Sequence, residues 1–292
     1  MKRLLFYSFA LFTLSLFILA PQATAQVQQA RASAPRAATL APADVDRIIR
    51  SFTAKETQFR EALNQYVFKR DAVIQTVGMG GQVSGEYHRI SYFTFDDKGN
   101  RYEKITFFPM PTLVGMAMTT EDLEDLGGIQ PFALEASKLN QYNFTYVGKE
   151  RIDELDLYVF DVGPKVMPNP KKSSERFFQG RIWVDDHDLQ IVKVRGKGVP
   201  EGKQRFPTFE TYREQIDGRF WFPTYTYANE EIVFEDGEVI HFRMKVTYSD
   251  FKRGRADVRI TEIDDMGPGV EDQPQTKPET KPSPTTTPPT KP

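Results

Sequence analysis

The sequence contains no cysteine among its 292 residues. This absence excludes disulfide bonds, thiolate nucleophiles, cysteine-ligated metal centres and the lipidated cysteine of an anchored lipoprotein. The chain holds only three histidines, and none has a second histidine at the spacing of a zinc-binding motif. It holds only two tryptophans, both in expected strands, whereas sugar hydrolases usually present several aromatic platforms.

Motifs that carry catalysis are also missing. There is no Gly-x-Ser-x-Gly nucleophile elbow, and Gly78–Gly81 lacks the lysine and the helix of a phosphate-binding loop. The formal net charge of −2 argues against nucleic acid, whose phosphates need a strongly basic face. We therefore expect no catalytic residues, no metal, no cofactor and no nucleic-acid partner. A secreted hydrolase is the least favoured alternative. It stays open because the many acidic residues include candidates for the carboxylate pair that glycoside hydrolysis needs.

The first 25 residues have the three regions of a secretory signal peptide. Lys2 and Arg3 form a basic start, an apolar run spans 4–20, and an Ala-Thr-Ala triplet at 23–25 offers the small residues of a cleavage site. We therefore expect cleavage before Gln26 and a soluble protein in the periplasm. The alternative is an uncleaved anchor helix.

Two low-complexity segments flank the expected domain. Residues 26–41 are rich in alanine, glutamine and arginine, and we expect a flexible N-terminal segment there. Residues 265–292 are rich in proline, threonine and lysine, so we expect a disordered tail that acts as a spacer. A tether that spans the cell wall or docks on a partner is the alternative. The folded part is then one domain over 42–264, long enough to bury a sizeable core.

The tail is predicted to be dispensable for folding. A protein that ends at Gly267 should melt at the same temperature as the full chain, because the removed residues offer almost no apolar surface to bury. Differential scanning calorimetry of the two proteins measures this directly. A melting temperature several degrees lower in the shortened protein would show that the tail packs on the domain.

Residues 42–67 predict the one long helix. Pro42 suits a first helical turn, and Asp44 and Asp46 complement the positive end of the helix dipole. Apolar side chains at helical spacing predict one buried face, formed by Val45, Ile48, Ile49, Phe52, Phe59, Leu63, Tyr66 and Val67. We expect this helix to lie across the open face of a sheet.

After residue 67, aromatic and β-branched residues alternate with turn clusters such as Asp217-Gly218. Strands are expected at 67–77, 85–95, 101–108, 141–148, 155–162, 177–185, 189–196, 208–215, 219–227, 230–235, 238–250 and 256–263. Short links permit only antiparallel neighbours. The fold class is therefore mainly β (α+β), a curved antiparallel sheet of about eleven strands that forms an incomplete β-barrel. The long helix and a short one lie in its concave face.

One segment interrupts the strands. Between Phe107 and Met118 the chain carries two prolines and three methionines, and a short helix over 120–126 follows. Because methionine fills irregular apolar space, we expect segment 109–126 to line and gate a hydrophobic site. Ordinary core filling below a loop is the alternative. The candidate ligand-binding residues come from this segment and from the long helix: Met110, Leu113, Met116, Met118, Leu123, Leu126, Phe52 and Phe59.

Basic side chains gather in two stretches, at 165–176 and 193–205. The second stretch contains Lys193, Arg195, Lys197, Lys203 and Arg205. A basic rim of this kind suits the phosphates of a membrane surface. Solvated loop charges are the alternative interpretation.

Two motifs resemble those of the LolA-like superfamily of periplasmic lipoprotein carriers. In the hairpin 180–194, a strand that ends in Val-Asp leads through an acidic turn into an Ile-Val-Lys strand. The second motif is Gly-Arg-Phe-Trp-Phe-Pro at 218–223. The signal peptide and a helix that runs straight into strands follow the same order as in that superfamily. The resemblance, over about 42–263, implies an unclosed β-barrel whose helices cover a cavity for acyl chains.

The resemblance and the apolar segment together predict a periplasmic carrier, not an enzyme. Its ligand would be a lipid, lipoprotein acyl chains or another hydrophobic molecule held in a concave apolar cavity. The alternative is an envelope sensor or scaffold of the same fold that binds a protein. A dry cavity favours the carrier, whereas a filled core with an exposed apolar edge favours the protein-binding alternative. We expect a monomer.

Overall fold

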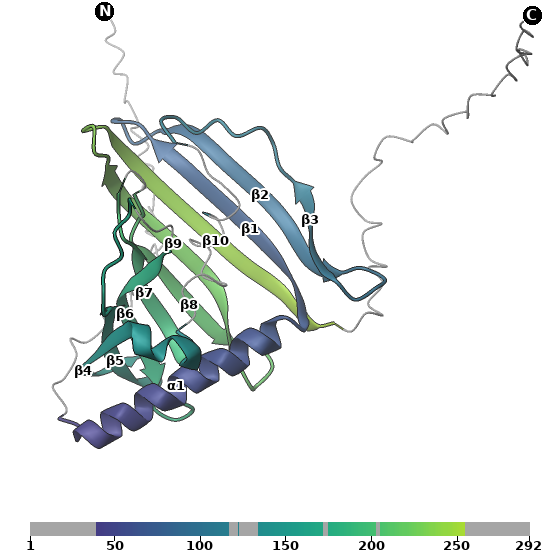
Figure 1. The fold of residues 1–292 in the computed structure, drawn as a ribbon. Helices are drawn as coiled ribbons and strands as arrows, with labels where there is room; N and C mark the ends of the chain where they lie inside the picture. The colour runs from purple at the N-terminus through teal and green to yellow at the C-terminus, as the bar shows by residue number, and fades with distance from the viewer. Residues whose placement is uncertain (1–38, 117–121, 123–133, 172–174, 203–204, 255–292) are drawn as a thin grey trace, which may run out of the picture.

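The computed structural model describes residues 39–116, 122, 134–171, 175–202 and 205–254. In these ranges a long α-helix precedes a ten-stranded antiparallel sheet (Figure 1). The elements in chain order are α1 (Pro42–Leu63), β1 (Tyr66–Val77), β2 (Val83–Phe95), β3 (Arg101–Phe107), the 3₁₀ helix η1 (Ala136–Gln141), β4 (Tyr142–Ile152), β5 (Leu155–Pro164), β6 (Phe177–Asp185), β7 (Ile191–Val199), β8 (Phe209–Gln215), β9 (Trp221–Val233) and β10 (Val239–Arg253).

The sheet consists of two meanders joined by one long-range pairing. Its strand order is β3-β2-β1-β10-β9-β8-β7-β6-β5-β4, so β1 pairs with β10 although these strands lie at opposite ends of the domain's sequence. Among the described strands, β3 and β4 are the two edges, and they do not pair with each other to close the sheet. This arrangement confirms the predicted fold class, a curved antiparallel sheet that forms an incomplete barrel.

The structure differs from the expected elements at two places that it describes. The strands expected at 219–227 and 230–235 form one strand, β9, because Ala228 and Asn229 stay in register with Met244 and Arg243 of β10. The helix ends at Leu63, before residue 67, because Tyr66 and Val67 already pair with β10. The short helix expected at 120–126, the strand expected at 256–263, the signal peptide and the tail 265–292 lie outside the described residues, except for Asp122.

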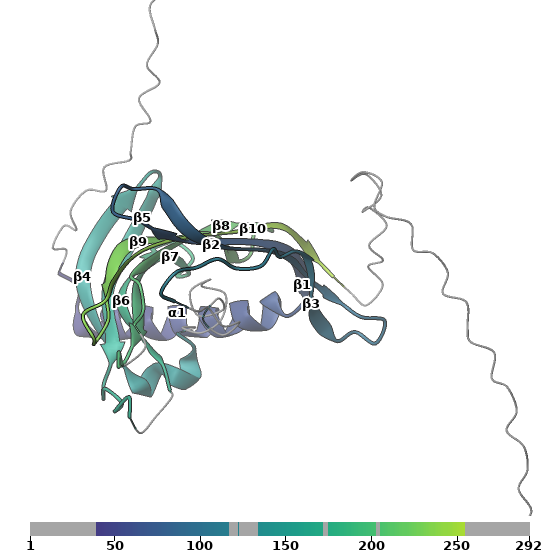
Figure 2. The ribbon, with the colours of Figure 1, turned by 90° about the horizontal axis from the view of Figure 1, so that it is seen from above.

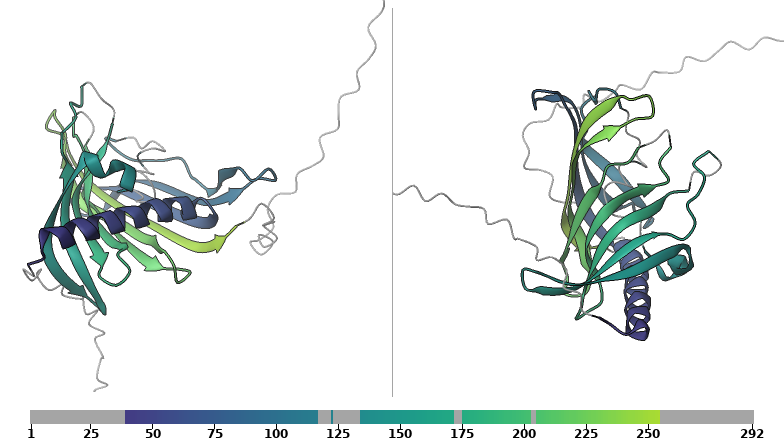
Figure 3. Two further views of the ribbon diagram at one scale, coloured as in Figure 1. Left: turned by 60° about the horizontal axis from the view of Figure 1, so that its bottom comes forward. Right: turned by 90° about the vertical axis from the view of Figure 1, so that its left-hand side faces the viewer.

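Helix α1 lies along the concave side of the curved sheet, as expected (Figures 2 and 3). Phe52 has its ring centroid 5.6 Å from those of Phe144 and Phe160, and Phe59 lies 5.4 Å from Phe222. Side chains alternate between the two faces of β10. Its inward set is buried, and its members are Ile240, Phe242, Met244, Val246 and Tyr248. The helix therefore packs on a core made by the inward side chains of the strands.

Two buried or partly buried ionic contacts fix α1 on the sheet. The Arg213 guanidinium of β8 donates to both carboxylate oxygens of Glu56, at 2.6 and 3.1 Å. Arg60 pairs with Glu135, the residue before η1. At the helix end, Arg101 Nη1 donates to the carbonyl oxygen of Leu63 at 2.8 Å. These contacts tie the helix to β8, to η1 and to β3.

Strands β6 and β7 approach closely at a pair of glycines. Gly180 and Gly196 lie opposite each other in the ladder, and the Phe178 ring covers both of them. A Cβ atom built on Gly180 would lie 2.2 Å from the carbonyl oxygen of Arg195, well inside van der Waals contact. Only glycine allows this approach, which occurs where the sheet curls toward β4 (Figure 2).

The acidic turn 185–188 completes its own hydrogen bonds. The Asp185 carboxylate accepts from the backbone N–H groups of His187 and Asp188, at 3.2 and 2.9 Å. Asp188 accepts from the Trp221 indole at 2.8 Å. Burial raises the pKa of the Asp185 carboxyl above its usual range. The turn therefore has a structural role, and it links the two motifs that carry the resemblance.

Candidate functional site

A group of charged side chains lies on the concave face of β1, β2 and β3. Arg70 stands between Phe68 and Ala72 in the inward register of β1, and both of these neighbours belong to the main core. Arg89 is inward on β2, while Arg101 and Glu103 are inward on β3. We call these four residues the arginine cluster.

Glu103 bridges two of the arginines. Its Oε1 accepts from Arg70 Nη2 at 2.8 Å, and its Oε2 accepts from Arg89 Nη2 at 2.5 Å. The side chains are 2 %, 11 % and 16 % exposed for Arg70, Arg89 and Glu103, so Arg70 is the deepest member. One carboxylate therefore compensates two buried guanidinium groups.

Arg101 adds a further positive charge beside this bridge. Its guanidinium carbon lies 5.0 Å from the ring centroid of Phe68 and 5.6 Å from that of Phe93. Burial lowers the pKa of Arg101 to about 10, which leaves it protonated at neutral pH. No carboxylate of the described chain forms an ion pair with it. The arginine cluster therefore carries an excess of positive charge.

Three buried polar atoms of this region have no hydrogen-bond partner within the described residues. They are Arg70 Nε, Arg89 Nε and Ser91 Oγ. Ser91 is fully buried and lies directly opposite Arg70 in the ladder between β1 and β2. Because buried polar groups in proteins are almost always hydrogen-bonded, these donors mark a place where an acceptor is missing.

The free edge beside the arginine cluster is apolar and exposed. We call Ile105, Phe107, Phe108 and Met110 the β3 rim; their exposed fractions lie between 44 % and 88 %. The Phe108 ring lies 5.1 Å from that of Tyr87 and covers the Arg89 guanidinium at 5.7 Å. Exposed apolar patches of this kind mark binding surfaces. Phe108 therefore connects the rim to the arginine cluster, whereas the Phe107 ring lies 4.9 Å from that of His88 on the convex face.

Segment 109–116 crosses the neighbouring ends of β1 and β2. Thr112 exchanges backbone and side-chain hydrogen bonds with Glu86, and the Val114 N–H donates to Thr76 Oγ1 at 3.5 Å. Leu113 and Met116 pack against the main core, whereas Met110 is 88 % exposed. A charge at Leu113 or Met116 would therefore disturb the core, whereas a charge at Met110 tests the surface alone.

The structure brings some of the predicted site residues together. Phe52 and Phe59 are buried between α1 and the sheet, and Leu113 and Met116 pack against the same core. Met110 stands apart in solvent. The other three candidates, Met118, Leu123 and Leu126, lie outside the described residues.

Sequence reasoning missed the arginine cluster. A usable signal was present in the run Phe68-Lys69-Arg70-Asp71-Ala72, where strand alternation places Arg70 among inward apolar residues. An arginine in an inward register needs a partner. That partner, Glu103, lies on another strand, and sequence spacing does not reveal it.

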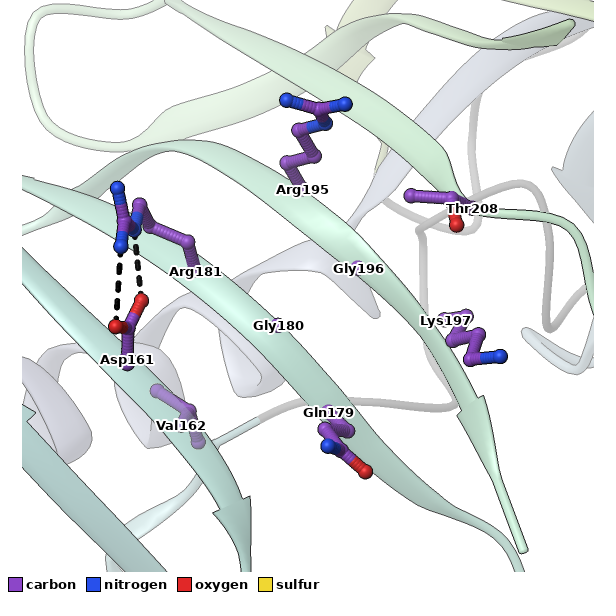
Figure 4. Close-up of a pocket in the computed structure, with 9 residues that line it drawn as sticks. All are labelled: Asp161, Val162, Gln179, Gly180, Arg181, Arg195, Gly196, Lys197 and Thr208. Atoms are coloured by element: carbon purple, nitrogen blue, oxygen red, sulfur yellow. Dashed lines mark hydrogen bonds and ion pairs between the residues drawn. The ribbon is translucent and has the colours of Figure 1, made fainter. Parts of the chain in front are cut away.

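A second, shallower site lies on the convex face (Figure 4). It has a volume of about 530 Å³ and is lined by polar side chains of β5, β6 and β7 and by Thr208. Its cations have carboxylate partners: Arg181 donates to Asp161 at 2.7 and 3.0 Å, and Lys197 contacts Glu201 at 2.5 Å. Arg195 and Lys197 lie on β7, and Arg195 also has a carboxylate nearby, that of Glu210 at 3.8 Å.

No three acidic or histidine side chains of the described residues are grouped so that they could hold a metal ion. No helix in the described ranges is both long enough and apolar enough to span a bilayer.

Comparison with known proteins gives similarities of fold. No protein-family model and no curated protein matches the chain. A DUF1329 family protein from Desulfovibrio piger is 14 % identical over 71 % of this chain and 92 % of its own, with a TM-score of 0.35. A putative outer membrane lipoprotein-sorting protein domain from Vibrio parahaemolyticus is 10 % identical over 70 % and 92 %, with a TM-score of 0.30. MucB in complex with MucA is 12 % identical over 67 % and 94 %, with a TM-score of 0.20. A lipoprotein-sorting domain, the kind of protein that the sequence motifs resemble, is thus among the structural neighbours.

Proposed function

We propose that the protein binds a lipid-like molecule, whose apolar part enters at the β3 rim and lies against the concave face, and that it carries this molecule in the periplasm. One observation carries the proposal. The β3 rim exposes four large apolar side chains at the end of β3 and just after it, and Phe108 links it to the inward side chains Tyr87 and Arg89.

The energetics favour an acyl chain at this place. Each CH₂ group removed from water contributes about 0.8 kcal/mol, so a chain of ten carbons that covers the rim would bind with useful affinity. The sheet is open between β3 and β4, so such a chain meets no closed wall at the edge. Phe52 and Phe59 hold α1 on the core, where they pack against Phe160 and Phe222.

A protein partner is the second candidate function. Strand β3 is an edge of the described sheet with exposed Tyr102 and Ile105, and such an edge can accept a further strand from another chain. The core below α1 is filled, with Phe52 and Leu63 fully buried. These observations favour an envelope sensor or scaffold that binds a protein. A measurement of amphiphile binding distinguishes the two functions, because only the carrier is expected to bind an amphiphile.

The binding test compares two exposed methionines. Met110→Asp should weaken the binding of a fluorescent fatty acid about tenfold, because it removes apolar contact and adds a charge at the rim. Met79→Asp is the matched control, because Met79 is fully exposed in the turn between β1 and β2. Fluorescence titration of both variants gives the two affinities.

Equal affinities for the two variants would exclude the rim as the binding surface. If the unaltered protein binds no fatty acid, the carrier proposal fails. In that case the β3 edge as a docking strand becomes the better account. Unchanged melting temperatures of both variants serve as the folding control.

A further inference from the structure

We infer that the bound molecule carries an oxyanion head, a carboxylate or a phosphate, which the arginine cluster and Ser91 hold on the concave face. This inference rests on the proposed function and deepens it. It assigns a head-group chemistry to a site whose apolar wall is the β3 rim.

The charge balance of the arginine cluster favours the binding of an anion. Glu103 is the only carboxylate among the described residues that contacts Arg70 or Arg89, and Arg101 has no carboxylate partner among them. The other titratable pair near these strands, His88 with Asp71 at 3.0 Å, lies on the opposite, convex face. Buried cations without a counterion are costly, so an anion would stabilise this face.

The arginine cluster has unused hydrogen-bond donors. Arg70 and Arg89 each give one nitrogen to Glu103, while Nε of both arginines has no partner in the described part of the chain. Ser91 Oγ, opposite Arg70, is a third group on the same face without a partner among the described residues. Guanidinium groups bind carboxylate and phosphate oxygens with two parallel hydrogen bonds, so this set matches an oxyanion.

The guanidinium groups of the arginine cluster have apolar surroundings. The Phe93 ring lies 4.8 Å from the Arg70 guanidinium, and Phe108 covers that of Arg89. Arg89 and Glu103 keep slight exposure, whereas Arg70 is closed to solvent. A free, fully hydrated anion gains little binding free energy in these apolar and nearly closed surroundings. An amphiphile would place its head on the arginine cluster and its chain on the rim.

The experiment compares ligands of one chain length at pH 8, where a fatty acid is ionised. Dodecanoic acid, dodecyl phosphate, dodecanol and inorganic phosphate each compete with the uncharged dye Nile red on the full-length mature protein. The two anionic amphiphiles should displace the dye at concentrations at least about tenfold lower than dodecanol, as expected for charge-assisted hydrogen bonds. Inorganic phosphate alone should neither displace the dye nor raise the melting temperature.

Two variants of one ion pair should change the affinity in opposite directions. Arg89→Gln should weaken dodecanoic acid binding about tenfold and leave dodecanol unchanged. Glu103→Gln should strengthen acid binding, because it removes the competing carboxylate and frees two guanidinium groups. Both variants break the same contact, so a general folding defect cannot produce opposite shifts. Arg195→Gln, on the convex face, is the control and should change nothing.

Each contrary outcome has one meaning. Equal affinity for acid and alcohol in the unaltered protein would overturn the head-group inference and leave lipid binding intact. Stabilisation by inorganic phosphate as strong as that by the acid would point to a free anion and overturn the amphiphile. If no amphiphile binds, the proposed function fails together with the inference. Weaker acid binding in both variants would assign the cluster a structural role and overturn the inference.

Discussion

Replacing Arg213 by alanine should lower the free energy of unfolding by about 3–5 kcal/mol. Glu56 and Arg213 are 4 % and 8 % exposed, and the alanine variant leaves the Glu56 carboxylate buried without its partner. For a domain of this size the loss corresponds to a melting temperature lower by roughly 10 °C. Thermal unfolding followed by circular dichroism measures it.

Two matched variants show whether the effect belongs to the buried pair. Arg47→Ala removes an exposed partner of Asp44 on the same helix, and it should cost less than about 1 kcal/mol. The double variant Glu56→Leu with Arg213→Met should recover most of the lost stability, because it leaves no unpaired charge. An Arg213→Ala protein within 1 kcal/mol of the unaltered one would show that this pair does not fix α1.

Gly180→Ala should lower the free energy of unfolding by about 3 kcal/mol, at the upper end of the cost of overpacking. The new Cβ atom would lie 2.2 Å from the Arg195 carbonyl oxygen and 2.5 Å from Gly196 Cα. Both obstacles are backbone atoms, so β6 and β7 would have to separate. Urea unfolding gives the change in free energy.

Gly163→Ala is the control for the glycine prediction. Gly163 also lies in a strand, β5, but its nearest neighbour to a new Cβ atom is the flexible Gln179 side chain at 3.8 Å. This variant should stay close to the unaltered protein in stability. Equal losses for the two variants would mean that loss of glycine as such, and not the close approach of β6 and β7, sets the cost.

Local patterns in the sequence predict much of the fold. Pro42 begins the long helix as expected, and the alternation at 239–248 assigns both faces of β10 correctly. Turn chemistry locates the strand boundaries, but it divides β9 in two because Ala228 and Asn229 are poor strand formers. The pairing of β1 with β10 joins the ends of the domain, and no local signal reports it.

The candidate site is less accessible to sequence reasoning. The apolar segment was expected to supply ligand contacts, and the structure divides it into core residues such as Leu113 and the exposed Met110. Arg70 and Glu103 lie on strands that are not adjacent in the sheet, and only the folded face brings them together. The basic stretch 193–205 is interpreted as solvated loop charge or a membrane rim, although Lys193, Arg195 and Lys197 lie on β7. Charge partners across strands are thus the information that the sequence pattern lacks.

Native mass spectrometry of the protein purified from its own cell envelope tests the central claim most directly. The protein should carry a bound adduct, and extraction should release an amphiphile with a carboxylate or phosphate head. The Met110→Asp protein, prepared in parallel, should carry less of it. A spectrum of bare protein from a gentle preparation, together with no binding of added dodecanoic acid, would contradict the account.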